Sequence, residues 1–165
     1  MRSEERSEWM DLVHPHPIAE LLDCPSRARD LLDGSAQSMN FDVCETVFRQ
    51  GARCRGLYVI ISGQFVRKAE RREARLVLGS ARPGHLVELA PLLSDGVHTC
   101  SLSAQEAGSL LMLPKEALYE AFAEYPPLRM HLLEELAREV SRGYIASSKD
   151  WSARMRQRVN GLTAG

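Results

Sequence analysis

The segment LYVIISGQFV at residues 57–66 decides the fold class of this 165-residue chain. Residues 57–61 form a continuous run of branched and aromatic side chains, which is typical of a buried strand. Ser62-Gly63 is a tight-turn pair, and residues 64–67 have the composition of a hairpin partner. The segment therefore predicts two antiparallel strands joined by a glycine turn.

Similar short apolar runs, separated by glycine turns, extend outward from this segment between Phe41 and Pro114. We expect one strand over residues 41–48 and a short turn before it at 36–39. Residues 99–104 alternate in polarity, as in a strand with one buried face. The charged run at residues 68–75 is interpreted as the solvated end of a hairpin, because it is too short for a stable helix. Seven or eight short strands at this spacing indicate a sandwich or barrel.

Helical patterns flank the strands on both sides. We expect a loose arm at 1–13, a short helix starting near Ile18, and a second short helix capped by Ser26. After the strands, residues 115–124 predict a short helix. A long helix should then run from about 128 to 159, with an interruption near Gly143.

The long helix carries apolar residues at nearly heptad spacing, as in a coiled-coil seam. A helix of about 30 residues would be about 45 Å long, more than a small barrel can cover. A parallel homodimer through this helix is the preferred interpretation, and packing of its first two turns on the chain's own barrel is the alternative. The predicted seam consists of Leu133, Ala137, Val140, Tyr144 and Trp151.

The composition limits the classes of function. The net charge of −1 gives no overall field that would favour nucleic acid or anionic lipid. The four cysteines do not have the spacing of a zinc site, and the sequence shows neither a signal peptide nor an apolar run long enough to cross a membrane. These features predict a reduced, cytoplasmic protein. No motif places a general base beside a nucleophile, so we expect no enzyme activity, and no metal site is predicted.

The residues that carry a family resemblance lie between about 41 and 144. They are residues 47–51 (VFRQG), 57–63 (LYVIISG), Pro83-Gly84, 88–90 (ELA) and Leu113-Pro114. This pattern resembles the cyclic-nucleotide-binding domain of catabolite activator-type and FNR-type regulators, kinase regulatory subunits and gated channels. The resemblance implies a mainly β fold with flanking helices: a jelly-roll β-roll (double-stranded β-helix) with short N-terminal helices and a long C-terminal dimerisation helix. We accordingly divide the chain into 1–40, 41–114 and 115–165.

In that family, a loop glycine, a glutamate and an arginine hold the cyclic phosphate and the ribose. The corresponding residues here are Val87, Glu88 and His98, so only the glutamate is kept. The imidazole of His98 is largely neutral and cannot form the two parallel hydrogen bonds that an arginine gives to a phosphate. The branched side chain of Val87 stands where a glycine would leave the backbone N–H open to the phosphate. Binding of cyclic AMP is therefore expected to be degenerate. The expected ligand-contacting set is Val87, Glu88, Leu89, Ala90, His98, Thr99 and Cys100.

Several functional hypotheses remain open at this point. The first is a regulatory module that senses a small ligand, such as a cyclic nucleotide or another small anion, or that works as a dimeric interaction module on a protein partner. The others are a fragment of a transcription regulator without its helix-turn-helix domain, and a structural interaction protein whose pocket its own side chains fill. Direct DNA binding and membrane association are not expected. Cys54 or Cys100 could act as a redox-sensitive thiol, and the alternative is that both are buried, unreactive cysteines in strands.

Overall fold

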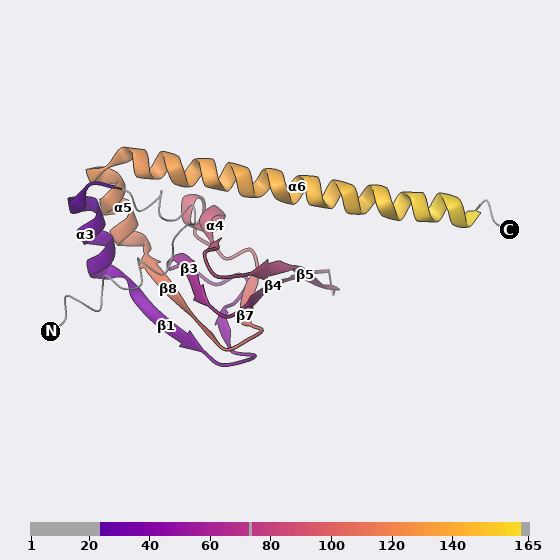
Figure 1. Cartoon of the computed structure of the whole chain (residues 1–165), viewed down its shortest axis with the longest axis horizontal. Helices are drawn as coiled ribbons and strands as arrows, with labels where there is room; N and C mark the ends of the chain where they lie inside the picture. The colour runs from indigo at the N-terminus through magenta and orange to yellow at the C-terminus, as the bar shows by residue number, and fades with distance from the viewer. Residues whose placement is uncertain (1–23, 73, 163–165) are drawn as a thin grey trace.

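The computed structural model describes residues 24–72 and 74–162. In this part the chain forms a two-sheet β-roll flanked by helices, with one long helix running along the roll and beyond it (Figure 1). The expected fold class is thus confirmed. The arm expected at 1–13 and the short helix expected near Ile18 lie outside the described residues.

Each sheet has four antiparallel strands. The first sheet has the order β1-β8-β3-β6, formed by Gln37–Phe41, Gly108–Pro114, Gly56–Ser62 and Leu86–Val87. The second has the order β2-β7-β4-β5, formed by Thr46–Phe48, Ser101–Ala104, Phe65–Arg71 and Ala74–Ala81. Sequential strands often lie in different sheets, as expected for a jelly-roll arrangement.

The glycine turn in LYVIISGQFV connects the two sheets and does not close a hairpin, so the predicted pairing of its two strands is wrong. β3 pairs with β6 and β8, whereas β4 pairs with β5 and β7. Gly63 has a φ of 78° and its Cα packs on the turn before β8, where an added Cβ would lie 2.7 Å from the carbonyl oxygen of Ala107. Glycine therefore allows both the left-handed backbone and the close approach that the crossing requires.

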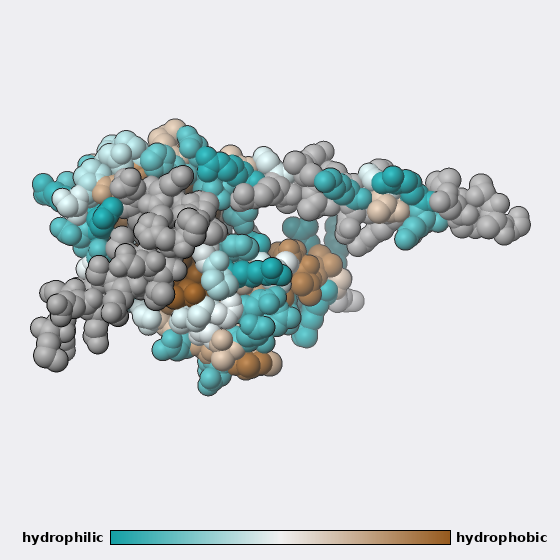
Figure 2. Space-filling view, in the orientation of Figure 1, coloured by the Kyte–Doolittle hydropathy of each residue, from teal (hydrophilic) through white to brown (hydrophobic). Residues whose placement is uncertain are grey.

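The charged run at 68–75 is a hairpin end, as predicted. β4 and β5 pair from Phe65 opposite Ala81 to Arg71 opposite Ala74, with one shift of register between Arg67 and Lys68. Leu76, Val77 and Leu78 of β5 are exposed, and Figure 2 shows apolar surface over this hairpin, beside the long helix. This apolar surface is a feature of the fold that the alternating pattern did not reveal.

Two apolar cores stabilise the roll. One lies between the sheets and includes Phe48, Tyr58, Ile60, Phe65, Val87, Cys100, Leu102 and Leu110. The other lies between the first sheet and the helices and includes Leu32, Leu57, Val59, Leu89, Leu92, Leu111, Leu118 and Leu132. β3 contributes alternate side chains to both cores, so its continuous apolar run reflects burial on both faces.

The helices are α3 (Ser26–Ser35), α4 (Leu89–Leu93), α5 (Lys115–Glu124) and α6 (Pro126–Leu162). α3 and α5 lie side by side at one end of the roll (Figure 1). α5 has the predicted bounds. None of the helices in the described ranges is long and apolar enough to cross a membrane.

Four local expectations were wrong. Ser26 is the first helical residue of α3 and makes no capping hydrogen bond, since Pro25 occupies the N-cap position. Residues 37–41 are a strand paired with β8 and not a turn. The single strand expected over 41–48 is divided by a turn in which Cys44 has a φ of 71°. α6 continues without a break past Gly143.

Candidate functional site

The segment from the end of β6 to the start of β7 contains the predicted ligand-contacting residues, and its geometry is set at Glu88. This residue occupies the N-cap position of α4 with a φ of 79°, in the left-handed region. A non-glycine residue in that conformation costs about 1 kcal/mol. The side chain of Glu88 is buried and makes contacts that offset this strain, so both backbone and side chain are fixed.

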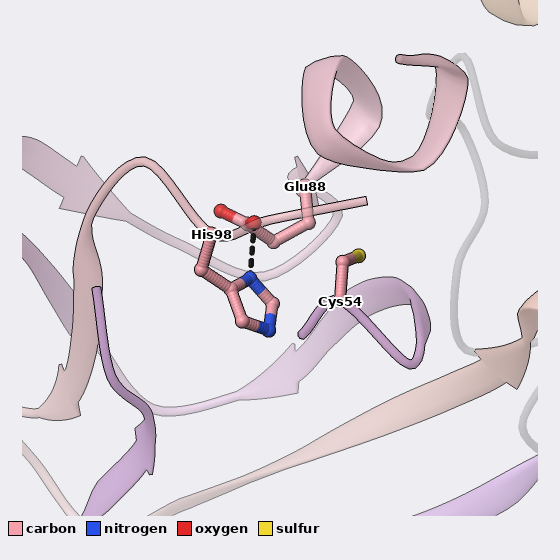
Figure 3. A group of neighbouring side chains, drawn as sticks. All are labelled: Cys54, Glu88 and His98. Atoms are coloured by element: carbon pink, nitrogen blue, oxygen red, sulfur yellow. Dashed lines mark hydrogen bonds and ion pairs between the residues drawn. The ribbon is translucent and has the colours of Figure 1, made fainter. Parts of the chain in front are cut away.

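The Glu88 carboxylate is paired with His98 (Figure 3). Oε2 of Glu88 and Nδ1 of His98 share a short hydrogen bond, and the two side chains are only 4% and 1% exposed. The other carboxylate oxygen, Oε1, accepts from Sγ of Cys100 at 3.9 Å. The carboxylate of Glu88, the one predicted phosphate- or ribose-contacting residue that matches the family pattern, is therefore directed into the protein.

The imidazole of His98 fills space between the two sheets. Its ring stacks on Phe48 with 3.9 Å between centroids and 7° between planes. Its backbone is held by the segment before β3, because His98 N–H donates to the Ala52 carbonyl and Gly51 N–H donates to the His98 carbonyl. The ring is thus locked by packing as well as by the Glu88 contact.

Burial favours the neutral forms of the carboxyl, thiol and phenol groups in this region. It raises the pKa of Glu88, and the neighbouring His98 opposes that rise. Burial raises the pKa of Cys54, the pKa of Cys100 to about 11 and the pKa of Tyr58 to about 12. The thiols are protonated at neutral pH, so neither behaves as an activated nucleophile.

The other predicted contact residues are distributed over different environments. Val87 is 1% exposed, lies opposite Tyr58 in the first sheet and packs between the sheets. Leu89 belongs to the core beneath the helices, while Ala90 and Thr99 are exposed. Of the seven predicted residues, His98 and Cys100 are each brought into contact with Glu88. The structure does not place the seven as one continuous lining.

Sequence reasoning considered the thiol of Cys54 only for a redox role, and it did not place Cys54 or Phe48 beside Glu88 and His98. Cys54 N–H donates to the Gly96 carbonyl at 2.6 Å, which holds its thiol beside the Glu88–His98 pair, and its Sγ donates to the Gly56 carbonyl at 3.3 Å. The contact between Cys54 and Gly96 joins segments far apart in the chain. Only the pairing of residues 51–54 with 96–98, which has no local sequence signal, could have revealed these two neighbours.

Arg67 on β4 is the cation associated with this region. Its Nη1 donates to Oε1 of Glu139 on α6 at 2.9 Å. Burial raises the pKa values of Glu88 and Cys100, and the charge of Arg67 opposes part of that rise. Its Nε is buried and has no hydrogen-bond partner among the described residues. Arg67 therefore links the roll electrostatically both to the loop and to the long helix.

A surface hollow of about 470 Å³ lies elsewhere, between α3 and α5. It is lined by Arg27, Asp30, Leu31, Glu120, Ala123 and Glu124. None of the predicted ligand-contacting residues borders it. It lies outside the loop on which the sequence-based expectation rests.

Comparison with known proteins identifies a family that matches this chain. A family model described as cyclic nucleotide-binding domain matches residues 39–125, which is more than half of the chain. No curated protein matches this chain significantly.

Solved structures show the same fold at low identity. The catabolite activator protein of Thermus thermophilus is similar with a TM-score of 0.66 and 23% identity, over 78% of this chain and 62% of that one. This chain thus spans less than two thirds of that protein's length. The sensor domain of the transcriptional regulator DNR from Pseudomonas aeruginosa is similar with a TM-score of 0.72 and 21% identity, over 84% of this chain and 93% of that one. A cyclic nucleotide-binding domain from Methylobacillus flagellatus gives a TM-score of 0.68 and 16% identity, over 79% and 80%. Together with the roll, the loop at Glu88 and the following long helix, the family match shows that this chain belongs to the cyclic nucleotide-binding domain family.

Proposed function

We propose that this chain is a non-catalytic regulatory module of the catabolite activator and FNR type. It works as a homodimer through α6 and does not hold cyclic AMP in the manner of the family. The buried Glu88–His98 pair carries the proposal, because the carboxylate that would meet a ribose is already engaged inside the roll. Val87 and the His98 ring occupy space that a phosphate and its cation would need.

The filled interior also favours the second candidate, an interaction module without a small ligand. The two candidates share the fold and the dimer and differ in whether the loop from 86 to 104 takes a ligand. In either case, signal transfer would run through the Arg67–Glu139 contact, which joins the roll to α6. A ligand or partner can shift the helix only if it binds two arrangements of this contact with different affinity.

Calorimetry of the full chain with cyclic AMP and cyclic GMP tests the ligand part. We expect dissociation constants weaker than about 10 μM, since loss of a charged contact to a desolvated phosphate costs several kcal/mol. The double variant Val87→Gly/His98→Arg should bind cyclic AMP more tightly than the natural chain does. Tight binding by the unmodified protein would contradict the degenerate-site proposal, and no gain in the double variant would favour the ligand-free module.

The dimer part is supported by the exposed apolar residues of α6. The side chains of Leu133, Val140 and Met155 are 38%, 62% and 42% exposed, and the helix projects well beyond the roll (Figure 1). Ala137 is also exposed, at seam spacing. Tyr144 and Trp151 complete the proposed seam, and their side chains lie outside the described residues.

Light scattering of matched variants tests the dimer. Val140→Glu would place an unpaired carboxylate in the seam, which costs about 3 kcal/mol and weakens association at least about 100-fold. Lys149→Glu adds a carboxylate at an exposed position outside the seam and should leave the mass unchanged. A monomeric natural chain at micromolar concentration, or equal behaviour of the two variants, would refute the seam.

A further inference from the structure

Three buried side chains with metal-binding atoms converge at one point of the roll. Cys54, Glu88 and His98 each offer a donor atom, and these atoms lie within 4.8 Å of one another. The residues are 3%, 7% and 2% exposed. They come from three segments: the loop before β3, the start of α4 and the loop before β7 (Figure 3).

We propose that Cys54, Glu88 and His98 form a binding site for one divalent transition-metal ion of the Zn²⁺ type. The site uses Glu88 and His98, the pair on which the proposed function also rests, but neither the family match nor the proposed dimer requires a metal, so a failed metal titration leaves both of them standing. A thiolate, a carboxylate and an imidazole are the ligand types that zinc takes, whereas Mg²⁺ and Ca²⁺ prefer oxygen alone.

The geometry lies close to what such an ion requires. Donor atoms around tetrahedral zinc are about 3.3–3.8 Å apart, given bond lengths of about 2.0–2.3 Å. Side-chain rotations that move the donors by about 1 Å are therefore sufficient, with the fourth position left for water. The ion would take the place of the hydrogen bond between Nδ1 of His98 and Oε2 of Glu88, and of the bond from Cys54 Sγ to the Gly56 carbonyl.

Charge also favours a divalent cation at this point. Cys54 binds as a thiolate and releases its thiol proton to solvent, and Glu88 binds as a carboxylate, so the two negative charges balance the ion. The surroundings hold the donors in place. Cys100 donates to the second carboxylate oxygen of Glu88, and Phe48 stacks on His98. Such supporting contacts orient metal ligands in known sites.

Titration of the full chain with Co²⁺ and Zn²⁺ after chelation tests the site. We expect one equivalent of Co²⁺ to give a thiolate-to-metal charge-transfer band together with tetrahedral visible bands, and Zn²⁺ to displace it. A spectrum without the charge-transfer band would overturn the assignment of Cys54. Failure to bind either ion at micromolar concentration would overturn the site altogether.

Variants identify the ligands. Cys54→Ser, Glu88→Gln and His98→Gln should each weaken Zn²⁺ binding at least about 100-fold, because loss of even an indirect partner costs about 10- to 100-fold. Cys44→Ser removes an exposed thiol outside the cluster and should bind as the natural chain does. Unchanged affinity in the three ligand variants, or a loss in Cys44→Ser, would refute the proposal.

Two further measurements keep the test decisive if a ligand variant unfolds. Circular dichroism of each metal-free variant separates lost binding from lost folding. X-ray absorption of the Zn²⁺-loaded natural chain should show a single sulfur neighbour with nitrogen and oxygen neighbours. A shell with no sulfur, or with several, would contradict the donor set.

Discussion

Replacing His98 by phenylalanine tests whether the Glu88–His98 pair stabilises the roll in the metal-free protein. Phenylalanine can keep the stacked contact with Phe48, so the change removes mainly the partner of the carboxylate. The Glu88 side chain is 4% exposed and would remain buried without its histidine. Removing one member of a buried pair costs about 3–5 kcal/mol, and we expect a loss of about 3 kcal/mol for His98→Phe.

Urea unfolding followed by circular dichroism measures this loss, and its pH dependence identifies the cause. In the natural chain burial raises the pKa of Glu88 and His98 opposes that rise, so removing the histidine should raise the folded-state pKa of Glu88 further. The folded state then binds the proton more tightly, so the stability of the variant falls as pH rises from the unfolded pKa through the folded one. The difference from the natural chain should therefore shrink at low pH.

The double variant His98→Phe/Glu88→Gln completes the cycle. A neutral amide is less costly to leave unpaired than a carboxylate, so the double variant should regain part of the stability that His98→Phe loses at about pH 7. A loss below about 1 kcal/mol for His98→Phe, or one that is the same at low and neutral pH, would refute the role assigned to the pair.

Two other changes probe the packing and the buried thiol. Gly56→Ala should destabilise the protein by about 3 kcal/mol or more in urea unfolding, because the added Cβ would lie 2.0 Å from the Leu113 carbonyl oxygen. In the control Gly34→Ala, the added Cβ meets nothing within 4 Å and should stabilise α3 by about 0.5–1 kcal/mol. Equal effects of the two substitutions would contradict the packing at Gly56. The pKa of Cys100 is raised from 9.0 to about 11, so above about pH 9 the unfolded thiol ionises while the folded one stays protonated, and the free energy of unfolding falls by about 3 kcal/mol in total up to about pH 11. Stability measured across this range should lose that component of its pH slope in Cys100→Ala and keep it in the exposed-thiol control Cys44→Ala; an unchanged slope in Cys100→Ala would be inconsistent with the shift.

The strands were predictable where local patterns determine them. The run at 57–61, the hairpin at 68–75 and the alternation of Cys100, Leu102 and Ala104 depend on side chains near in sequence, and the structure has strands at all three. The partner of β3 could not be predicted, because the Ser62-Gly63 signal specifies a reversal but not whether the chain stays in the same sheet. That choice is made by long-range packing against the turn before β8.

The candidate site was predicted in part, for a similar reason. The resemblance identified Glu88 and His98 by their positions in the loop, and the structure brings them into contact. The resemblance gave no indication that the side chains of Glu88 and His98 face each other. Cys54 and Phe48 reach the same place through backbone pairing between distant loops, which leaves no periodicity in the sequence.

The length of α6 has a mechanical consequence. A helix of 37 residues is about 55 Å long and behaves as a stiff rod. A tilt of about 5° at its base displaces the far end by about 5 Å, roughly one helical turn. The contact between Arg67 and Glu139 lies in the first half of this rod, about 20 Å from its base, so the same tilt moves this contact by only about 2 Å while the far end moves by about 5 Å. The roll can thus remain almost rigid while the tip moves far enough to exchange one set of contacts for another.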